Sequence, residues 1–99
     1  MRQIIVRYKV KPEHAAENQR LLEDVFAELK AKAPAGLRYL TVKTADDSYV
    51  HLAISEEGAL AFTAFESFKT YLAGVRDRLV EGPFQGEATI IGNYRMLPE

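Results

Sequence analysis

The opening segment of the chain, residues 2–10, alternates strictly between two kinds of side chain. One parity is apolar or aromatic and consists of Ile4, Val6, Tyr8 and Val10. The other parity mixes Ile5 with Arg7 and Lys9. Because successive side chains of a β-strand point to opposite faces, this pattern predicts a strand with one core face. The second face is too apolar for bulk water and too charged for a helix-covered interior, so it predicts contact with a partner.

Periodicity along the rest of the chain predicts two helices and three further strands. Pro12 is tolerated in a first helical turn, and an apolar stripe at helical spacing follows it as far as Ala33. Residues 37–44 and 48–55 read as two strands joined by a short polar link. A second helix is expected from Ser67 until Gly82-Pro83 closes it, and the last strand is expected from Gly86 to Met96.

This order of elements is typical of an α+β fold, the ferredoxin-like βαββαβ sandwich, in which two helices cover one face of a four-stranded antiparallel sheet. We expect residues 1–99 to form a single domain. The helix-covered face is expected to hold Val6, Tyr8, Leu40, Val42, Leu52, Ile54 and Ile90. The other face is expected to show Ile5, Arg7, Tyr39, Thr41, Tyr49, His51, Ala53, Ile91, Asn93 and Arg95.

The second sheet face predicts a homodimer. Contiguous apolar patches on a protein surface usually mark contacts, and packing against the same face of a second copy explains the mixture of side chains. The expected dimer interface consists of Ile5, Arg7, Tyr39, Thr41, Tyr49, His51, Ile91 and Asn93. RNA binding is disfavoured, because the central strand has a single aromatic residue on that face and lacks the glycine-aromatic motif of RNA-binding sheets.

Composition excludes several classes of function. The chain has no cysteine, so thiol catalysis and cysteine-ligated metal sites are excluded. A formal net charge of −1 predicts no attraction to nucleic acid or to anionic membranes. No apolar run approaches the ~20 residues that span a bilayer, and the start has no apolar signal segment. We therefore expect a cytoplasmic protein without a cofactor or a metal.

Residues with catalytic potential are few and scattered. His14 lies at the start of a surface helix, and His51 lies in the middle of a strand on the expected dimer face. Neither has acidic or histidine neighbours at a metal-ligand spacing. The chain has no Gly-x-Ser-x-Gly elbow and no phosphate-binding glycine loop. The sequence alone assigns no catalytic residue.

Three short segments carry a family resemblance, namely Val10–Glu13, residues 48–60 and Phe65–Lys69. On these segments the chain resembles the dimeric α+β barrel superfamily, in particular antibiotic biosynthesis monooxygenase (ABM)-like domains. The resemblance implies cofactor-free oxygenases of aromatic substrates, haem-degrading enzymes or isomerases. Oxygenase members often have a Trp where this chain has Ile54. Haem-degrading members have a His and an Asn where it has Thr63 and Val6, which disfavours haem degradation.

The resemblance also implies where a ligand would bind. Oxygenases of this superfamily hold their substrate between the sheet and the last helix, where the chain supplies several aromatic residues. We expect the ligand to contact Tyr8, Leu52, Ile54, Phe62, Phe65, Phe68, Tyr71 and Gly92. Tyr8 is of special interest, because a buried hydroxyl requires a polar partner and Gly92 is expected to leave room beside it.

Two functions remain open from the sequence. The first is a homodimeric protein that binds a small hydrophobic or aromatic ligand without chemistry of its own. The alternative is a cofactor-independent monooxygenase or isomerase acting on a small aromatic or polyketide-like substrate. In the second case the protein would exclude water and stabilise an electron-rich substrate anion.

Overall fold

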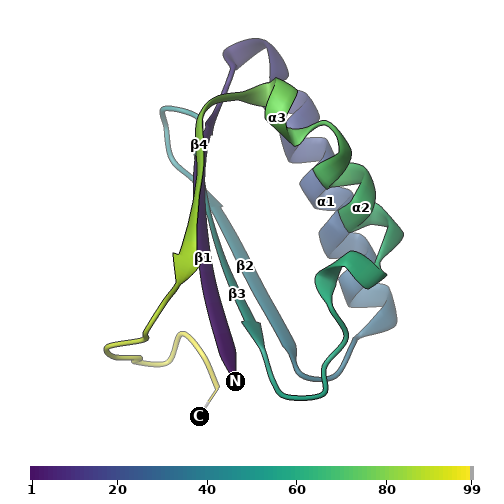
Figure 1. Cartoon of the computed structure of the whole chain (residues 1–99), viewed down its shortest axis with the longest axis vertical. Helices are drawn as coiled ribbons and strands as arrows, with labels where there is room; N and C mark the ends of the chain where they lie inside the picture. The colour runs from purple at the N-terminus through teal and green to yellow at the C-terminus, as the bar shows by residue number, and fades with distance from the viewer. Residues whose placement is uncertain (99) are drawn as a thin grey trace.

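The computed structural model describes residues 1–98 and contains four strands, three α-helices and two short 3₁₀ turns (Figure 1). In chain order the elements are β1 (Arg2–Val10), η1 (Pro12–His14), α1 (Ala15–Lys32), β2 (Leu37–Lys43), β3 (Ser48–Ser55), η2 (Phe62–Ala64), α2 (Glu66–Ala73), α3 (Val75–Arg78) and β4 (Leu79–Glu87). None of the helices in the described part of the chain combines the length and the apolar character that crossing a membrane requires.

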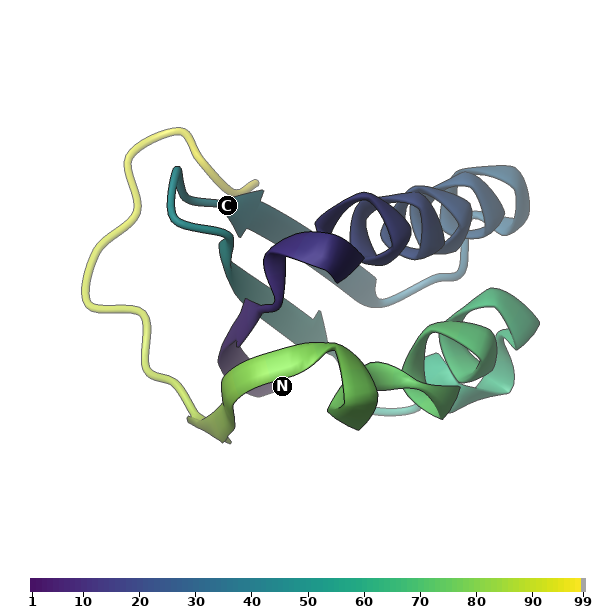
Figure 2. The same ribbon diagram turned by 90° about the horizontal axis from the view of Figure 1, so that it is seen from above.

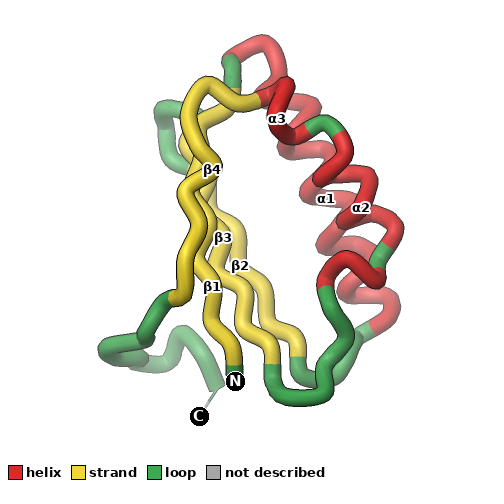
Figure 3. Tube along the Cα trace, viewed as in Figure 1, coloured by secondary structure: helices red, strands yellow, loops and turns green. Residues whose placement is uncertain are grey.

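The strands form one antiparallel sheet in the order β2-β3-β1-β4. The helices lie on one side of this sheet, and α1 and α2 run beside each other across it (Figures 2 and 3). No helix of the described residues 1–98 lies over the other side of the sheet (Figure 1). The ferredoxin-like α+β arrangement expected from the sequence is therefore confirmed.

Helix α1 supplies the largest part of the helical layer. It follows the turn that Pro12 opens, and it ends at Ala33, which has a left-handed conformation (φ 45°) and whose N–H donates to the Leu29 carbonyl. The buried side of α1 consists of Asn18, Leu21, Leu22 and Val25. The core between this helix and the sheet is completed by Tyr8, Val10, Tyr49 and Tyr71.

The prediction of which residues lie on the helix-covered face is correct for β1 but wrong for β2 and β3. Tyr8 is paired with Tyr49, and Val6 with His51, so these four residues share one face of the sheet. Thr41 is paired with His51 and Tyr39 with Ala53, which puts the matching residues of β2 on the same side. The helix-covered face therefore carries Tyr39, Thr41, Tyr49, His51 and Ala53, and the open face carries Leu40, Val42, Leu52 and Ile54.

The reason for this error is that β2 and β3 have apolar or aromatic residues at both parities. Alternation then identifies a strand but not which of its faces is inside. The structure places the hydroxyl- and imidazole-bearing rings under the helices, where they hydrogen-bond to one another. It leaves the aliphatic residues on the open face.

The second helix and the last strand also differ from expectation. The helix expected from Ser67 to Gly82 is broken at Gly74 into α2 and the four-residue α3, and β4 begins at Leu79. Gly82 and Pro83 lie inside β4, where the pairing with β1 shifts register. Proline is tolerated there because β4 is an edge strand. The segment 88–98, which includes most of the expected strand, has no strand structure.

The open face of the sheet carries an apolar surface that runs across all four strands. One row joins Leu40, Leu52 and Ile5, and the next row joins Val42, Val50, Arg7 and Phe84. Four of the apolar residues in these rows are exposed: Ile5 at 42%, Leu40 at 47%, Val42 at 48% and Phe84 at 53%. The Arg7 guanidinium lies 5.0 Å from the centre of the Phe84 ring, so the charged member of the surface is stacked on an aromatic one.

Candidate functional site

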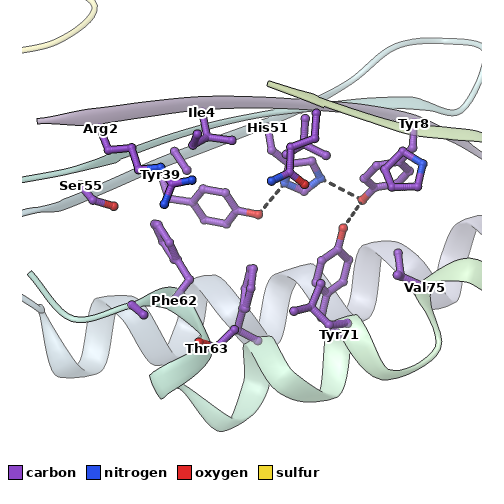
Figure 4. Close-up of a pocket in the computed structure, with 17 residues that line it drawn as sticks. Arg2, Ile4, Tyr8, Tyr39, His51, Ser55, Phe62, Thr63, Tyr71 and Val75 are labelled. Carbon is purple, nitrogen blue, oxygen red and sulfur yellow. Dashed lines mark hydrogen bonds between the residues drawn. The ribbon is translucent and has the colours of Figure 1, made fainter. Parts of the chain in front are cut away.

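A cavity of about 430 Å³ lies between the sheet and the α2 side of the helical layer. It is lined by Arg2, Ile4, Val6, Tyr8, Tyr39, His51, Ala53, Ser55, Ala61, Phe62, Thr63, Phe68, Tyr71, Leu72, Val75, Pro83 and Gln85. Figure 4 shows Tyr39, His51 and Tyr8 projecting from the sheet toward Phe62, Thr63 and Tyr71 of the helical side. The volume is in the range of small-molecule sites, and the lining combines aromatic walls with a few polar groups.

His51 is at the centre of the polar part of the wall and is 3% exposed. Its Nε2 atom lies 2.9 Å from the Tyr8 hydroxyl. Its Nδ1 atom lies 2.5 Å from the Tyr39 hydroxyl and 2.9 Å from the Thr41 hydroxyl. The ring is also stacked between Tyr8 and Tyr39, at centroid distances of 5.2 Å and 5.6 Å. These contacts fix both the position and the plane of the imidazole.

The Tyr8 hydroxyl joins the sheet to both main helices. Besides His51, it lies 2.6 Å from the Tyr71 hydroxyl of α2 and accepts a 3.1 Å hydrogen bond from Asn18 Nδ2 of α1. Three neighbours give this oxygen a complete hydrogen-bond shell in a buried position. Among residues 1–98, no buried side-chain nitrogen or oxygen lacks a hydrogen-bond partner.

Arg78 determines how Asn18 is oriented. The Arg78 Nε–H donates to Asn18 Oδ1 at 3.0 Å, and a second guanidinium N–H donates to the Tyr71 carbonyl at 2.7 Å. Arginine has only donors, so the Asn18 oxygen must face Arg78 and its NH₂ group must face Tyr8. Arg78 is 4% exposed, and its guanidinium lies 5.5 Å from the centre of the Tyr71 ring. Arg78 therefore orients the Asn18 amide so that its NH₂ group donates a hydrogen bond to Tyr8.

Burial determines which of these groups are charged. Burial lowers the pKa of His51 to about 4, so the imidazole is neutral near pH 7. Burial also raises the pKa of Tyr8, an effect that its hydrogen bonds with Asn18 and Tyr71 oppose. The pKa values of Tyr39 and Tyr71 are raised as well, mainly by burial. The cluster thus consists of a neutral imidazole, neutral phenols and one buried guanidinium.

The neutral cluster has two complete hydrogen-bond arrangements. In one, His51 Nε2–H donates to Tyr8, Tyr8 donates to Tyr71, and a hydroxyl of β2 donates to Nδ1. In the other, Tyr71 donates to Tyr8, Tyr8 donates to Nε2, and Nδ1–H donates to a hydroxyl of β2. A neutral imidazole has one donor and one acceptor nitrogen. The tautomer of His51 therefore fixes which group donates and which accepts in each hydrogen bond of the cluster from Tyr71 to β2. The arrangement can pass a proton between the cavity wall at Tyr39 and the interior at Tyr8.

The residues expected to bind a ligand fall into two groups. Tyr8, Phe62, Phe68 and Tyr71 line the cavity. The other four do not line it: Leu52 and Ile54 are on the open face, Phe65 is buried beside Lys32, and Gly92 lies beyond β4. The glycine that packs against Tyr8 is Gly82, where an added Cβ would lie 3.1 Å from Tyr8 Cβ.

The residues expected at a dimer interface are also divided. Ile5 and Arg7 lie on the open face, and Ile91 and Asn93 lie in the segment after β4. Tyr39, Thr41, Tyr49 and His51 lie under the helices instead, because the faces of β2 and β3 are reversed relative to expectation.

Sequence reasoning missed Asn18 and Arg78. Asn18 stands at the head of the apolar stripe of α1, at helical spacing before Leu22 and Val25. A polar residue at a core position of an amphipathic helix is a usable signal, because its burial requires partners. Arg78 follows Val75 by three residues in the same way, but its partner lies 60 residues away in the chain. No group of three or more His, Cys, Asp or Glu side chains within residues 1–98 is placed to hold a metal ion.

Comparison with known proteins identifies the fold. No family model and no curated protein matches the chain. Among solved structures, a candidate antibiotic biosynthesis monooxygenase from Bacteroides thetaiotaomicron is similar with a TM-score of 0.77 and 20% identity, over 98% of this chain and 95% of that one. A candidate of the same type from Nitrosomonas europaea has a TM-score of 0.74 and 16% identity, over 93% and 100% of the two chains.

A third similar structure is a mutant of SnoaB, a cofactor-independent oxygenase from Streptomyces nogalater. Its TM-score is 0.67 at 18% identity, over 94% of this chain and 95% of that one. Identities at this level establish a shared fold only. The resemblance read from the sequence is thus confirmed at the level of architecture: this chain has the fold of ABM-like proteins.

Proposed function

We propose that two copies of this chain form a homodimer, and that each copy binds a small aromatic molecule in the cavity between its sheet and its helices. The observation that carries the binding proposal is the cavity itself. Its aromatic side chains offer flat surfaces, and Tyr39 and His51 offer polar atoms at one wall. An aromatic molecule with one hydroxyl or keto group matches that combination.

The dimer proposal is supported by the open face of the sheet. Apolar residues from β1, β2 and β3, with Phe84 of β4, form a continuous surface there. Beyond β4, Ile91 is 95% exposed, Tyr94 80% and Met96 78%. Large apolar residues at such exposure are stabilised when a partner covers them. A second copy offers the same surface, and two copies would bury both.

A binding experiment with a matched pair of variants tests the ligand proposal. Ala53 lines the cavity, whereas Ala27 lies on the exposed side of α1. We expect 2-naphthol to bind the unmodified protein and A27L equally, and to bind A53L at least tenfold more weakly, because the larger side chain occupies the cavity. Calorimetric titration measures all three affinities. Equal binding to A53L, or no binding to the unmodified protein, would contradict the proposal.

The second candidate function is cofactor-independent oxygenation. The observation that favours it is the neutral His51, linked through Tyr39 to the cavity wall. A substrate with an acidic CH₂ group could give its proton to the Tyr39 oxygen while Tyr39 passes its own proton to His51 Nδ1. The resulting carbanion would react with dioxygen, and the CH₂ group would become a carbonyl as one oxygen atom enters the product and the other leaves as water. The positive charge of Arg78 and the exclusion of water would stabilise the anion.

Oxygen consumption distinguishes this candidate from binding alone. With anthrone as the probe, catalysis predicts one O₂ consumed for each molecule oxidised, at a rate about 100-fold or more above the reaction without protein. H51Q should lose most of this rate while it still binds 2-naphthol. Binding of the probe without faster oxygen uptake would leave the chain as a binding protein.

A further inference from the structure

The charges around the cavity are all of one sign. Among the seventeen residues that line it, Arg2 is the charged one, and none of them is Asp or Glu. Near pH 7 the His51 imidazole adds no charge of its own. Among residues 1–98, the lining of the cavity thus includes a cation and no carboxylate.

Arg78 adds a second positive charge behind the opposite end of the cavity. Its guanidinium lies against the Tyr71 ring and bonds to an amide and a carbonyl, both of which are neutral. Within residues 1–98, none of the ion pairs involves Arg78 or Arg2. Arg78 is buried, and a buried cation without a counter-charge is costly, whereas Arg2 is exposed. An anion in the cavity would be attracted by the positive charge of both arginines.

The two polar ends are separated along the sheet. Arg2 is paired with Ser55 near one end of β1, and Val6 is paired with His51 four residues further on. Four residues of strand correspond to roughly 13 Å. Figure 4 shows Arg2 at the Ser55 end of the cavity, with Tyr39 between it and the His51–Tyr8 pair. A ligand that contacts both ends therefore needs a flat, elongated body with polar groups at its two extremities.

We infer that the cavity selects an aromatic carboxylate of about two fused rings, with its carboxylate at Arg2 and a hydroxyl or keto group at Tyr39 and His51. The ring system would lie against Phe62 and Phe68, which line the cavity. Arginine matches a carboxylate with two parallel N–H donors, so the charged end would be bound through paired hydrogen bonds. This inference rests on the proposed function, since it specifies the chemistry of the aromatic ligand.

A matched pair of probes separates charge from shape. The acid is 6-hydroxy-2-naphthoate, and the neutral partner is 6-hydroxy-2-naphthamide, which has nearly the same size and the same hydroxyl. We expect the unmodified protein to bind the acid about tenfold more tightly than the amide at pH 7 and low salt. In R2Q the affinity for the acid should fall about tenfold, whereas the affinity for the amide should stay unchanged. The control R20Q, on the exposed surface of α1, should preserve the preference.

The outcomes are distinct. A preference for the acid that R2Q abolishes and R20Q retains supports the inference. Equal binding of acid and amide to the unmodified protein overturns the selection of a carboxylate but leaves the aromatic cavity in place. An equal loss of affinity for both probes in R2Q also overturns the selection of a carboxylate, because Arg2 would then act by packing rather than by charge. Failure of both probes to bind overturns the proposed function and this inference together.

Discussion

The Tyr8 hydroxyl lies 2.6 Å from the Tyr71 hydroxyl, although 63 residues separate them in the chain. Tyr8 comes from the inner strand β1 and Tyr71 from the helix α2, so this bond connects the two layers directly. The Tyr8 hydroxyl also hydrogen-bonds to His51 and Asn18, whereas within residues 1–98 the Tyr71 hydroxyl has the single hydrogen bond to Tyr8. The two tyrosines are thus unequal members of one cluster.

That inequality predicts different costs for removing each hydroxyl. Y8F leaves His51 Nε2, Asn18 Nδ2 and the Tyr71 hydroxyl without their partner, and we expect it to lower the free energy of unfolding by about 3 kcal/mol. Y71F removes a single bond and should cost about 1 kcal/mol. Urea denaturation measures both values. Equal losses in the two variants would contradict the central role assigned to Tyr8.

His51 predicts a loss of stability in mild acid. Its pKa is lowered to about 4 in the folded protein, against an ordinary value of about 6.5 in the unfolded chain. Below pH 6.5 the unfolded state therefore binds a proton that the folded state does not, and stability falls until the pH reaches about 4. The full effect is on the order of 3 kcal/mol.

The comparison with H51Q isolates this effect. The difference in free energy of unfolding between the unmodified protein and H51Q should stay constant above pH 7 and shrink as the pH falls from 6.5 to 4. Denaturant titrations at fixed pH values measure it. A constant difference over that range would show that His51 titrates alike in the folded and unfolded states.

The proposed dimer interface on the open face predicts that a single introduced charge there prevents dimer formation. Leu40 is 47% exposed in the centre of the β2 portion of this face, and Leu60 is 58% exposed in the loop before η2. L40K should give a monomer at micromolar concentration, because the lysine would be buried unpaired between two sheets. L60K should remain a dimer. Light scattering after gel filtration measures both masses, and a dimeric L40K would place the interface elsewhere.

Gly82 predicts a backbone-specific loss of stability. It has a φ of 89°, and an added Cβ would lie 2.9 Å from the Arg7 carbonyl oxygen. G82A should therefore lower the free energy of unfolding by about 1–3 kcal/mol. Gly92 has open space around it and no positive φ, so G92A should change stability by less than about 0.5 kcal/mol. Thermal denaturation compares the two variants, and equal melting temperatures would contradict the packing at Gly82.

The hydrogen bonds of the Glu28 carboxylate predict a second loss of folding stability in acid, at lower pH than the loss caused by His51. Its carboxylate on α1 accepts hydrogen bonds from the Ser67 backbone N–H, at 3.0 Å, and from the Ser67 hydroxyl at the start of α2. Hydrogen bonds from Lys32 and Ser67 lower the pKa of Glu28 to about 2. The stabilisation is therefore present above about pH 4.5 and lost as the pH falls toward 2.

The variant E28Q should remove this second transition. It should be less stable than the unmodified protein at pH 7, and the difference should disappear between pH 4.5 and 2. Circular dichroism during acid titration follows both proteins. If the difference persisted at pH 2, the contact between α1 and α2 would not depend on the charge of Glu28.

The order of the elements, the bounds of β3 and the interior face of β1 could all be predicted from the sequence. These features rest on local signals: Pro12 opens a helix, and β1 has apolar residues at one parity and charges at the other. The same signals failed in β2 and β3, because both parities of those strands are apolar or aromatic. They also failed after Gly74, because a Gly-Pro pair stops a helix and also fits an edge strand.

Which rings meet at the cavity depends on the packing of the helices on the sheet. His51 is joined to Tyr8 across 43 residues, and Arg78 to Asn18 across 60. Such pairs leave no periodic trace in the sequence, since each partner looks locally like an ordinary core or surface residue. The packing of α1 and α2 on the sheet brings them together, and the need of buried polar groups for hydrogen-bond partners then fixes which face of β2 and β3 is inside.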